Sequence, residues 1–302
     1  MENVLILYND SSGSNEGETI ATKLCTYLKT EQPEWDVWTH VSNAETKADT
    51  LRQFAHEHAI SRLVFIGGDG TIHHLVNTFR QEMDNYTIGI IPGGTVNNFA
   101  RSLNLPLKQE AAFEVIAQGR PKGVDYGVIN DKDVIISTLT IGLLADTAAR
   151  VSQKEKQTYG PLAFMKRFFK LLRKKKRYPL VFDSKEKKWS GKSSLVTITM
   201  TNSAGGYVHF DESASPDDGQ MHITILDRLN FYQTLRLLPK IILGKLSEIE
   251  SVEYFSTDHV TITSTKKQVR TRTDGDPTDD LPVTLHVVKQ GMQVLVKQES
   301  SL

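Results

Sequence analysis

The sequence predicts an α/β N-terminal domain with a mostly parallel sheet, followed by a β-sandwich domain. Three observations support this fold class. Strand and helix patterns alternate through about Gln118, two apolar runs in that region each end in a glycine-rich turn, and the chain becomes β-rich after about Gly119. The chain has 302 residues, which is enough for two ordinary domains.

In the first domain the elements follow one another in a regular order. The pattern predicts strands at Val4–Tyr8 and Asp36–Val41 and helices at Glu16–Lys29 and Ala44–His58, and the apolar runs Arg62–Ile66 and Ile88–Ile91 add two more strands. Such alternation implies helices on both faces of a parallel sheet, with ligands at the carboxyl ends of the strands.

In the second domain several segments alternate apolar with polar residues, as half-buried antiparallel strands do. These segments are Val124–Ile129, Val134–Ile141, Leu180–Asp183, Ser194–Thr201, Met221–Leu226 and Val260–Ser264. We therefore place the α/β domain at residues 1–122 and the β-sandwich at residues 123–285, with an active-site cleft between them.

The two glycine-rich turns carry the strongest functional signal. The first contains Gly67, Gly68, Asp69, Gly70 and Thr71, and the second spans residues 92–98 with the sequence PGGTVNN. Glycine most often only makes a turn, but two such turns at adjacent strand ends, each with a hydroxyl, favour a polyphosphate site lined by backbone N–H groups. Thr71 and Thr95 can supply those hydroxyls, although each could equally be a helix N-cap.

Other polar residues are expected at the same edge of the sheet. The first strand ends in a polar turn made of Asn9, Asp10, Ser11, Ser12 and Gly13, and Ser42 follows the second strand, so we include all six among the nucleotide contacts. Asp69 lies inside the first glycine turn, where a carboxylate would repel phosphates unless a divalent cation lay between them. This argues for Mg²⁺ in the nucleotide complex, and the alternative is a carboxylate that caps a turn.

Four sequence blocks occur in an order typical of one known family. The blocks are GGDGT (67–71), PGGTVNNFAR (92–101), ASPDDGQMHI (214–223) and DGD (274–276) with a following Leu-Pro (281–282). In these blocks, which span nearly the whole chain, the sequence resembles the diacylglycerol kinase catalytic-domain family in its bacterial branch of YegS-like lipid kinases. The first block alone is not diagnostic, because NAD kinases carry a similar turn, but the later blocks separate the two.

The resemblance implies an NAD kinase/diacylglycerol kinase-like, Rossmann-like N-terminal domain. It implies ATP and Mg²⁺ as cofactors and a lipid hydroxyl as the acceptor. It also suggests that the last predicted strands, Val283–Val287 and Met292–Val296, return to the first domain, so that residues of about 286–302 would complete it.

Asp276 matches the family's general base by position. The family has Glu there, and that carboxylate is taken to accept the proton of the lipid hydroxyl. Asp is one methylene shorter, and a misplacement of ~1 Å can cost on the order of 10²-fold in rate. Asn98 is a second departure, because the family usually has Asp in the second loop. A plain acidic surface turn is the alternative interpretation of residues 274–280.

A further block implies a metal site in the second domain. Family members place a structural magnesium ion in the turn at residues 215–220, bound by one Asp side chain and neighbouring carbonyl groups. The match assigns Asp218, with the carbonyl groups of Ser215 and Gln220. Without the resemblance, a type I turn that enters a strand would be the preferred interpretation.

Composition limits the remaining possibilities. Lys and Arg number 36 and so do Asp and Glu, so any preference for a partner depends on where the charges lie. The single cysteine, Cys25, excludes a disulfide within the chain and has the helical spacing of a buried residue. No run approaches the ~20 apolar residues of a membrane span, so we expect a cytoplasmic protein that binds peripherally to the inner face of the membrane.

Residues 164–178 form a basic segment with an apolar stripe of Phe164, Phe168, Leu171 and Leu172 at helical spacing. Such a helix can lie on an anionic membrane, although a solvated basic face and a nucleic-acid patch are the alternatives. The neutral chain and the lack of aromatic stacking motifs argue against nucleic acid. The strands of a β-sandwich could also pair into a homodimer.

The sequence therefore favours an ATP-dependent lipid kinase that phosphorylates a diacylglycerol-like hydroxyl, with Asp69 and Asp276 as its catalytic residues. A regulator on the same fold with little turnover is the first alternative, because of Asn98 and Asp276. A kinase with a soluble substrate, of the NAD kinase type, is the second, although it would make little use of the basic segment.

Overall fold

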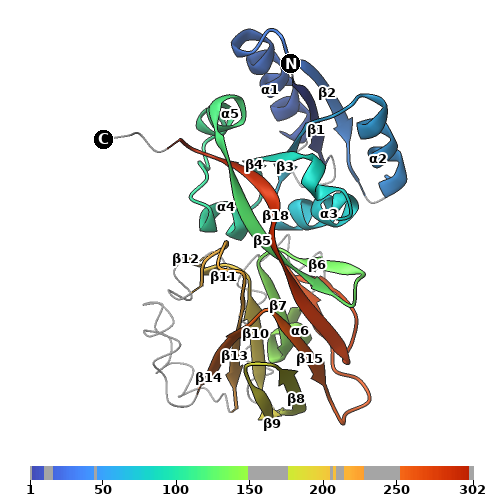
Figure 1. Cartoon of the computed structure of the whole chain (residues 1–302), viewed down its shortest axis with the longest axis vertical. Helices are drawn as coiled ribbons and strands as arrows, with labels where there is room; N and C mark the ends of the chain where they lie inside the picture. The colour runs from blue at the N-terminus through green and yellow to red at the C-terminus, as the bar shows by residue number, and fades with distance from the viewer. Residues whose placement is uncertain are drawn as a thin grey trace. The chain divides into compact units, whose positions relative to one another are not determined.

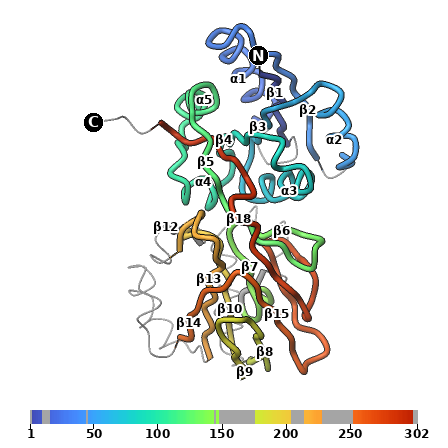
Figure 2. Tube along the Cα trace, in the orientation of Figure 1, coloured from blue at the N-terminus to red at the C-terminus, as the bar shows by residue number. Residues whose placement is uncertain are grey.

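The protein divides into two compact units, made of residues 1–125 with 289–302 and of residues 126–288 (Figure 1). The computed structural model describes residues 2–9, 16–43, 46–148, 176–204, 207–208, 214–227 and 252–298. Two strands, β5 (Arg120–Ile129) and β18 (Val283–Val296), continue from one unit into the other, as the trace in Figure 2 shows.

The first unit contains a parallel sheet with the strand order β2-β1-β3-β4-β18. Its first four strands are β1 (Asn3–Tyr8), β2 (Asp36–Val41), β3 (Arg62–Gly67) and β4 (Thr87–Pro92). The last part of β18 completes the sheet, with Gln293 and Val294 opposite Thr87 and Ile88 of β4. All carboxyl ends of β1 to β4 therefore lie at one edge, and the predicted parallel sheet is confirmed.

Helices cover both faces of this sheet (Figure 1). They are α1 (Glu16–Glu31), α2 (Ala48–Glu57), α3 (Asp69–Phe79), α4 (Asn98–Ser102) and α5 (Gln109–Gln118), with a 3₁₀ turn, η1, at Met83–Asn85. α1 and α5 share a hydrophobic core with alternate strand residues such as Ile6 and Val64. The strand residues between them, such as Leu7 and Phe65, are also fully buried, and they face the side covered by α2 and α3.

The second unit is an antiparallel β-sandwich. One sheet has the order β14-β13-β10-β7-β16-β17, and the other contains the first part of β18 with β15, β8 and β9, as well as β5 with β6. The strands are β6 (Asp133–Ile135), β7 (Thr138–Gly142), β8 (Tyr178–Ser184), β9 (Lys188–Ser193), β10 (Leu195–Thr199), β13 (Met221–Leu226), β14 (Val252–Thr257), β15 (His259–Thr263), β16 (Thr271–Thr273) and β17 (Asp276–Pro277). A short helix, α6 (Leu143–Ala148), and a two-stranded ribbon, β11 (Ser203–Ala204) with β12 (Tyr207–Val208), complete it.

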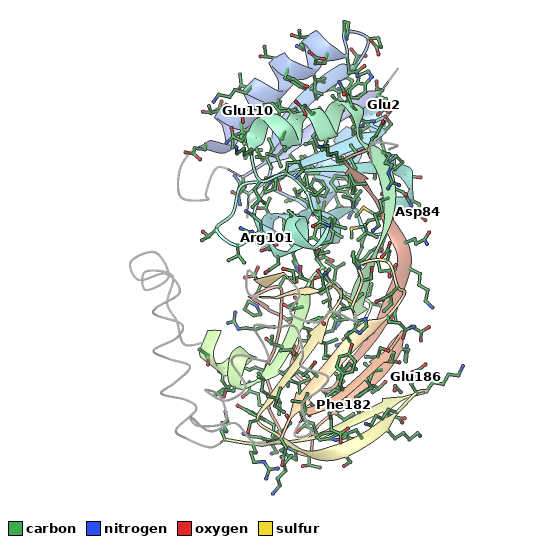
Figure 3. The ribbon with its side chains drawn as sticks, turned by 90° about the vertical axis from the view of Figure 1, so that its left-hand side faces the viewer. Glu2, Asp84, Arg101, Glu110, Phe182 and Glu186 are labelled. Carbon is green, nitrogen blue, oxygen red and sulfur yellow. The ribbon has the colours of Figure 1, made fainter. Side chains whose placement is uncertain are left out.

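The core of the sandwich joins its two sheets. Phe182 of β8, labelled in Figure 3, is fully buried and lies edge-on to Phe255 of the opposite sheet, with ring centroids 6.3 Å apart. The same ring contacts Trp189 of β9 at 5.7 Å. The alternation seen in the sequence places these apolar side chains on the inner faces, and the predicted β-sandwich is confirmed.

Three sequence predictions of elements are corrected. Val134–Ile141 was expected to be one strand but forms β6 and β7, which belong to different sheets. The two segments predicted at 283–287 and 292–296 are one strand, β18. Tyr178, expected at the end of the basic helix, is the buried first residue of β8, while residues 164–175 lie outside the described part of the chain.

The glycine turns after β3 and β4 pack directly against each other. A Cβ atom on Gly94 would lie 2.6 Å from the Cα of Gly68, and one on Gly68 would lie 2.9 Å from the Cα of Gly94. The N–H of Gly93 also donates a hydrogen bond of 2.9 Å to the carbonyl of Gly67. Contacts this short between backbone atoms leave no room for a side chain, so glycine is required here by close approach.

Gly94→Ala is expected to force the two turns apart. The added methyl group would meet rigid backbone, so the free energy of unfolding should fall by about 1–3 kcal/mol, the usual cost of overpacking. Gly123→Ala is the control, because its methyl group would meet only the side chain of Gln290, at 3.0 Å. Urea denaturation of the three proteins measures the difference, and equal losses for both variants would contradict the account.

Tyr86, which follows η1, is a buried ionisable residue of the first unit. Only 4% of it is exposed, its ring packs edge-on against Phe79 at 5.4 Å, and its hydroxyl donates a 3.2 Å hydrogen bond to Glu82. Burial, together with the negative charge of Glu82, raises the pKa of Tyr86 to about 12. The folded protein therefore holds the phenol proton more tightly than the unfolded chain does.

This shift predicts a loss of stability at high pH. Below the ordinary tyrosine pKa of ~10 both states keep the proton, so the shift has no effect. As the pH rises toward 12 the unfolded chain loses the proton first, and the free energy of unfolding falls by up to ~2–3 kcal/mol. Tyr86→Phe should lack this component, so denaturation curves of the two proteins between pH 9 and 12 should differ. Parallel losses in both proteins would contradict the assignment.

Candidate functional site

The second glycine turn is held by a single asparagine side chain. The amide of Asn97 accepts a hydrogen bond from the N–H of Gly94 (2.9 Å) and donates one to the carbonyl of the same residue (2.7 Å). Asn97 itself has a left-handed conformation with φ 55°, which asparagine tolerates better than most residues. The Nε of Arg101, labelled in Figure 3, donates to the carbonyl of Val96 at 2.8 Å. The turn before α4 is thus fixed by its own side chains.

Asp69 joins the first turn to the second. One of its carboxylate oxygens accepts the N–H of Asn98 and the other accepts the N–H of Phe99, both at 3.0 Å. These are the first amide groups of α4, so Asp69 caps a helix that begins 29 residues later in the chain. The sequence alternative of a carboxylate cap therefore describes its geometry, and its proposed role toward Mg²⁺ stays a prediction.

The start of α3 is the part of the site best suited to an anion. Asp69, Gly70 and Thr71 form its first turn, in which backbone N–H groups have no acceptor within the helix. The positive end of the helix dipole lies at the same place. Gly93, Gly94 and Thr95 of the neighbouring turn are exposed to solvent. Because Asp69 binds the first amides of α4, the amides of Gly70 and Thr71 in α3 are the donors that we consider for a phosphate.

The other predicted nucleotide contacts are only partly described. Asn9 follows β1 and Ser42 follows β2, at the same edge of the sheet as both glycine turns. The hydroxyl of Ser42 is buried and has no hydrogen-bond partner among the described residues. Asp10, Ser11, Ser12 and Gly13 lie outside the described residues.

In the second unit, two aspartates of one hairpin have opposite surroundings. Asp274 and Gly275 form the two-residue turn between β16 and β17, with φ values of 49° and 95°. The carboxylate of Asp274 accepts the N–H groups of Ile136, Ser137 and Thr138 at 2.8 to 2.9 Å. Asp276, two residues later, is exposed. Of the two residues, Asp276 is thus the more exposed, and backbone amide groups bind the carboxylate of Asp274.

Arg272 lies beside this turn. Its guanidinium group donates a 2.7 Å hydrogen bond to the carbonyl of Gly275. Burial lowers the pKa of Arg272, and the nearby negative charge of Asp276 partly offsets that shift. The hairpin thus carries a cation next to the exposed carboxylate.

In the predicted metal turn the carboxylate of Asp218 makes several hydrogen bonds. One oxygen of Asp218 accepts the N–H of Ser215 (2.8 Å) and pairs with the Nε2 of His222 (2.9 Å), while the other accepts the N–H of Gln220 (2.9 Å). The Nδ1 of His222 lies 2.5 Å from the hydroxyl of Tyr254. Both oxygens of the carboxylate are therefore directed at hydrogen-bond donors of its own turn and of β13.

A magnesium ion held by Asp218 and the carbonyl groups of Ser215 and Gln220 stays a prediction. Burial raises the pKa of Asp218, but the hydrogen bonds from His222 and from the two backbone N–H groups outweigh burial and lower it below its ordinary value. These hydrogen bonds favour the ionised form of the carboxylate. Within the described ranges, no group of three or more His, Cys, Asp or Glu side chains is arranged to hold a metal ion.

Sequence reasoning missed several residues of the site. Asn97 lies in the second glycine-rich turn, three residues after Gly94, and this spacing was the available signal. His222 is the second residue of β13 and lies four residues after Asp218. Its partner Tyr254 lies on another strand, β14, and no local sequence pattern reveals that contact. Among the described residues, no helix is long and apolar enough to cross a membrane.

Comparison with known proteins identifies the two parts of the chain. The model of the diacylglycerol kinase catalytic domain matches residues 3–129, and that of the YegS C-terminal NAD kinase beta sandwich-like domain matches residues 139–296. A diacylglycerol kinase from Staphylococcus saprophyticus subsp. saprophyticus is 24% identical over 294 residues, which cover 97% of this chain and 95% of that protein. A diacylglycerol kinase from Bacillus subtilis (strain 168) is 25% identical over 303 residues, which cover 100% of this chain and 98% of that protein.

The fold agrees with these relatives. A solved structure of a diacylglycerol kinase from Bacillus anthracis (strain Sterne) superposes with a TM-score of 0.75 at 19% identity, covering 98% of this chain and 97% of that one. The family resemblance seen in the four sequence blocks is therefore confirmed. The chain belongs to the diacylglycerol kinase catalytic-domain family of bacterial lipid kinases, with a YegS-type β-sandwich as its C-terminal domain.

Proposed function

We propose that this protein is an ATP-dependent lipid kinase that transfers a phosphoryl group to the hydroxyl of a diacylglycerol-like lipid. Membership of the family supports a kinase. The observation that carries the proposal is the start of α3, where the amides of Gly70 and Thr71 have no acceptor within the helix and lie beside two glycine turns that are packed against each other. Backbone amides at a helix N-terminus are well suited to phosphate oxygens, and phosphoryl transfer depends mainly on positioning and charge stabilisation.

In this proposal ATP binds at the carboxyl edge of the parallel sheet. The amides of Gly70 and Thr71 would donate to the terminal phosphates, and Thr95 would contribute its exposed hydroxyl. Mg²⁺ bound together with ATP supplies positive charge that offsets the phosphate oxygens. The carboxylate of Asp69 keeps the two turns together, so that the amides of α3 remain aimed at one place.

Asp276 is proposed as the general base. The oxygen of the lipid hydroxyl forms a bond to the γ-phosphorus, the bond from that phosphorus to the β–γ bridging oxygen breaks, and ADP leaves. The hydroxyl proton passes to the carboxylate of Asp276. Its exposure suits this role, because a base must reach a substrate, whereas Asp274 is occupied by three amide groups.

The lipid substrate also motivates a membrane partner. The basic segment at residues 164–178 would bring the protein to an anionic lipid surface, with each basic group worth ~1 kcal/mol near the headgroups. Its last residues are described: Lys176 pairs with Asp146, and Arg177 pairs with Asp227. Because Lys176 and Arg177 are paired with aspartates, we assign the attraction to lipid to the other basic residues of the segment, from Lys166 to Lys175.

A regulator with little turnover is the second candidate. It is favoured by one observation, the presence of Asn98 and Asp276 where the family usually has Asp and Glu. In the structure Asn98 begins α4 and its backbone N–H binds Asp69. Such a protein would bind ATP and lipid on the same fold but would transfer phosphate slowly or not at all.

Transfer of labelled phosphate from MgATP to lipids in mixed micelles tests the proposal. The panel contains diacylglycerol, phosphatidylglycerol, a sphingoid base and a polyprenol, with NAD as a soluble control. Label in the diacylglycerol fraction is the expected result. Binding of ATP without transfer to any acceptor would support the regulator, and label in NAD alone would overturn the lipid substrate.

Asp276→Asn should separate catalysis from binding. Loss of the base is expected to lower the rate of transfer by about 10²–10⁴-fold, because a general base typically contributes that much. The affinity for ATP should stay within about twofold, since the proposed phosphate donors lie in the other unit. Steady-state kinetics and a fluorescent ATP analogue measure both quantities. An unchanged rate of lipid phosphorylation would remove Asp276 from the mechanism.

A further inference from the structure

The hairpin turn directly before Asp276 is fixed to the sheet by the carboxylate of one of its own residues, Asp274. The turn is short, because Thr273 and Asp276 pair across the hairpin and only Asp274 and Gly275 lie between them. Both turn residues have positive φ, the geometry of a two-residue hairpin turn. A free hairpin of this size would be weakly held, since β16 has three residues and β17 has two.

This hairpin is attached to the sheet through the pairing of β16 with β7, and Asp274 adds contacts to the turn itself. One of its oxygens accepts the N–H groups of Ser137 and Thr138 at 2.8 and 2.9 Å, and the other accepts the N–H of Ile136 at 2.9 Å. Its own N–H donates to the carbonyl of Thr138 at 2.8 Å. These four hydrogen bonds reach the segment between β6 and β7, which is more than 130 residues away in the chain.

The other side of the turn is held as well. The guanidinium group of Arg272 donates to the carbonyl of Gly275 at 2.7 Å. Asp274 and Arg272 therefore fix the two turn residues from both ends. The residue that follows directly is Asp276, whose carboxylate is exposed.

From this geometry we infer that Asp274 is a positioning residue, which fixes the backbone of Asp276 so that its short side chain reaches the acceptor hydroxyl. The inference rests on the proposed function. Asp has one methylene fewer than Glu, so its carboxylate has a shorter reach and depends more strongly on where the backbone lies. A misplacement of ~1 Å can cost on the order of 10²-fold in rate. The hydrogen bonds of Asp274 meet this requirement, because they fix the position of the backbone next to Asp276.

A carboxylate is the side chain that this position needs. Three N–H groups converge on it, and a carboxylate has two oxygens and no proton to oppose them. Asparagine would keep one oxygen for Ser137 and Thr138 but would turn an NH₂ group toward the N–H of Ile136. Asparagine also tolerates positive φ, so Asp274→Asn changes the hydrogen bonds without straining the backbone.

Asp274→Asn is therefore the test variant, and Asp131→Asn is its matched control. Asp131 lies in the three-residue turn between β5 and β6 and also has positive φ (55°), and its side chain is 89% exposed, 3.8 Å from His286. With diacylglycerol as acceptor, Asp274→Asn is expected to lower kcat by about 10–100-fold, with the KM for ATP within about twofold. Asp131→Asn should keep the wild-type kcat.

The double variant Asp274→Asn/Asp276→Asn shows whether the effect passes through Asp276. If Asp274 acts by positioning the base, it should have less than about a twofold effect once the base is removed. A full kcat in folded Asp274→Asn would overturn the inference. The inference would also be overturned if Asp274→Asn lowered kcat by the same factor in the presence and in the absence of Asp276. Loss of activity in Asp276→Asn together with full activity in Asp274→Asn would refute the inference alone and leave the proposed function intact.

Hydrogen exchange gives a readout that does not depend on activity. Asp274→Asn should speed the exchange of the amides at residues 136–138 and of the hairpin at 271–277, whereas Asp131→Asn should leave both unchanged. Unaltered protection in Asp274→Asn would show that the carboxylate does not fix the turn, even if the wild-type protein transferred no phosphate.

Discussion

The contact between two glycine turns is the constraint on which the proposed nucleotide site depends. With a Cβ atom on Gly94 placed 2.6 Å from the Cα of Gly68, neither turn has room for a side chain. The close approach brings the starts of α3 and α4 together, and only then can Asp69 reach the amides of Asn98 and Phe99. The parallel pairing of β3 with β4 makes this contact, because both strands end at the same edge of the sheet.

Two aspartates play the same structural part in the two units. Asp69 and Asp274 each bind backbone amides of a segment distant in the sequence, and each thereby decides which group stays available nearby. In the first unit Asp69 binds the first amides of α4, and in our proposal the amides of Gly70 and Thr71 in α3 bind an anion. In the second unit Asp274 binds three backbone amides, and in our proposal the exposed Asp276 accepts the proton of the lipid hydroxyl. The proposed kinase thus uses carboxylates both as connectors and as the base.

The sequence was sufficient for what depends on local pattern. Alternating elements predicted the parallel sheet and the sandwich, and the spacing of the glycines predicted the two turns. It was insufficient where the deciding partner lies far along the chain. The break between β6 and β7 occurs where Asp274 accepts hydrogen bonds from three amide groups. The carboxylate of Asp218 pairs with His222, which in turn contacts Tyr254 on another strand.

A crystal structure with Mg²⁺ and a non-hydrolysable ATP analogue tests the central claim most directly. The account predicts that the terminal phosphate oxygens lie within hydrogen-bonding distance of the amides of Gly70 and Thr71, with the contact between Gly68 and Gly94 unchanged. A nucleotide bound away from the start of α3, or phosphates that contact neither amide, would contradict the claim that these two turns form the nucleotide site.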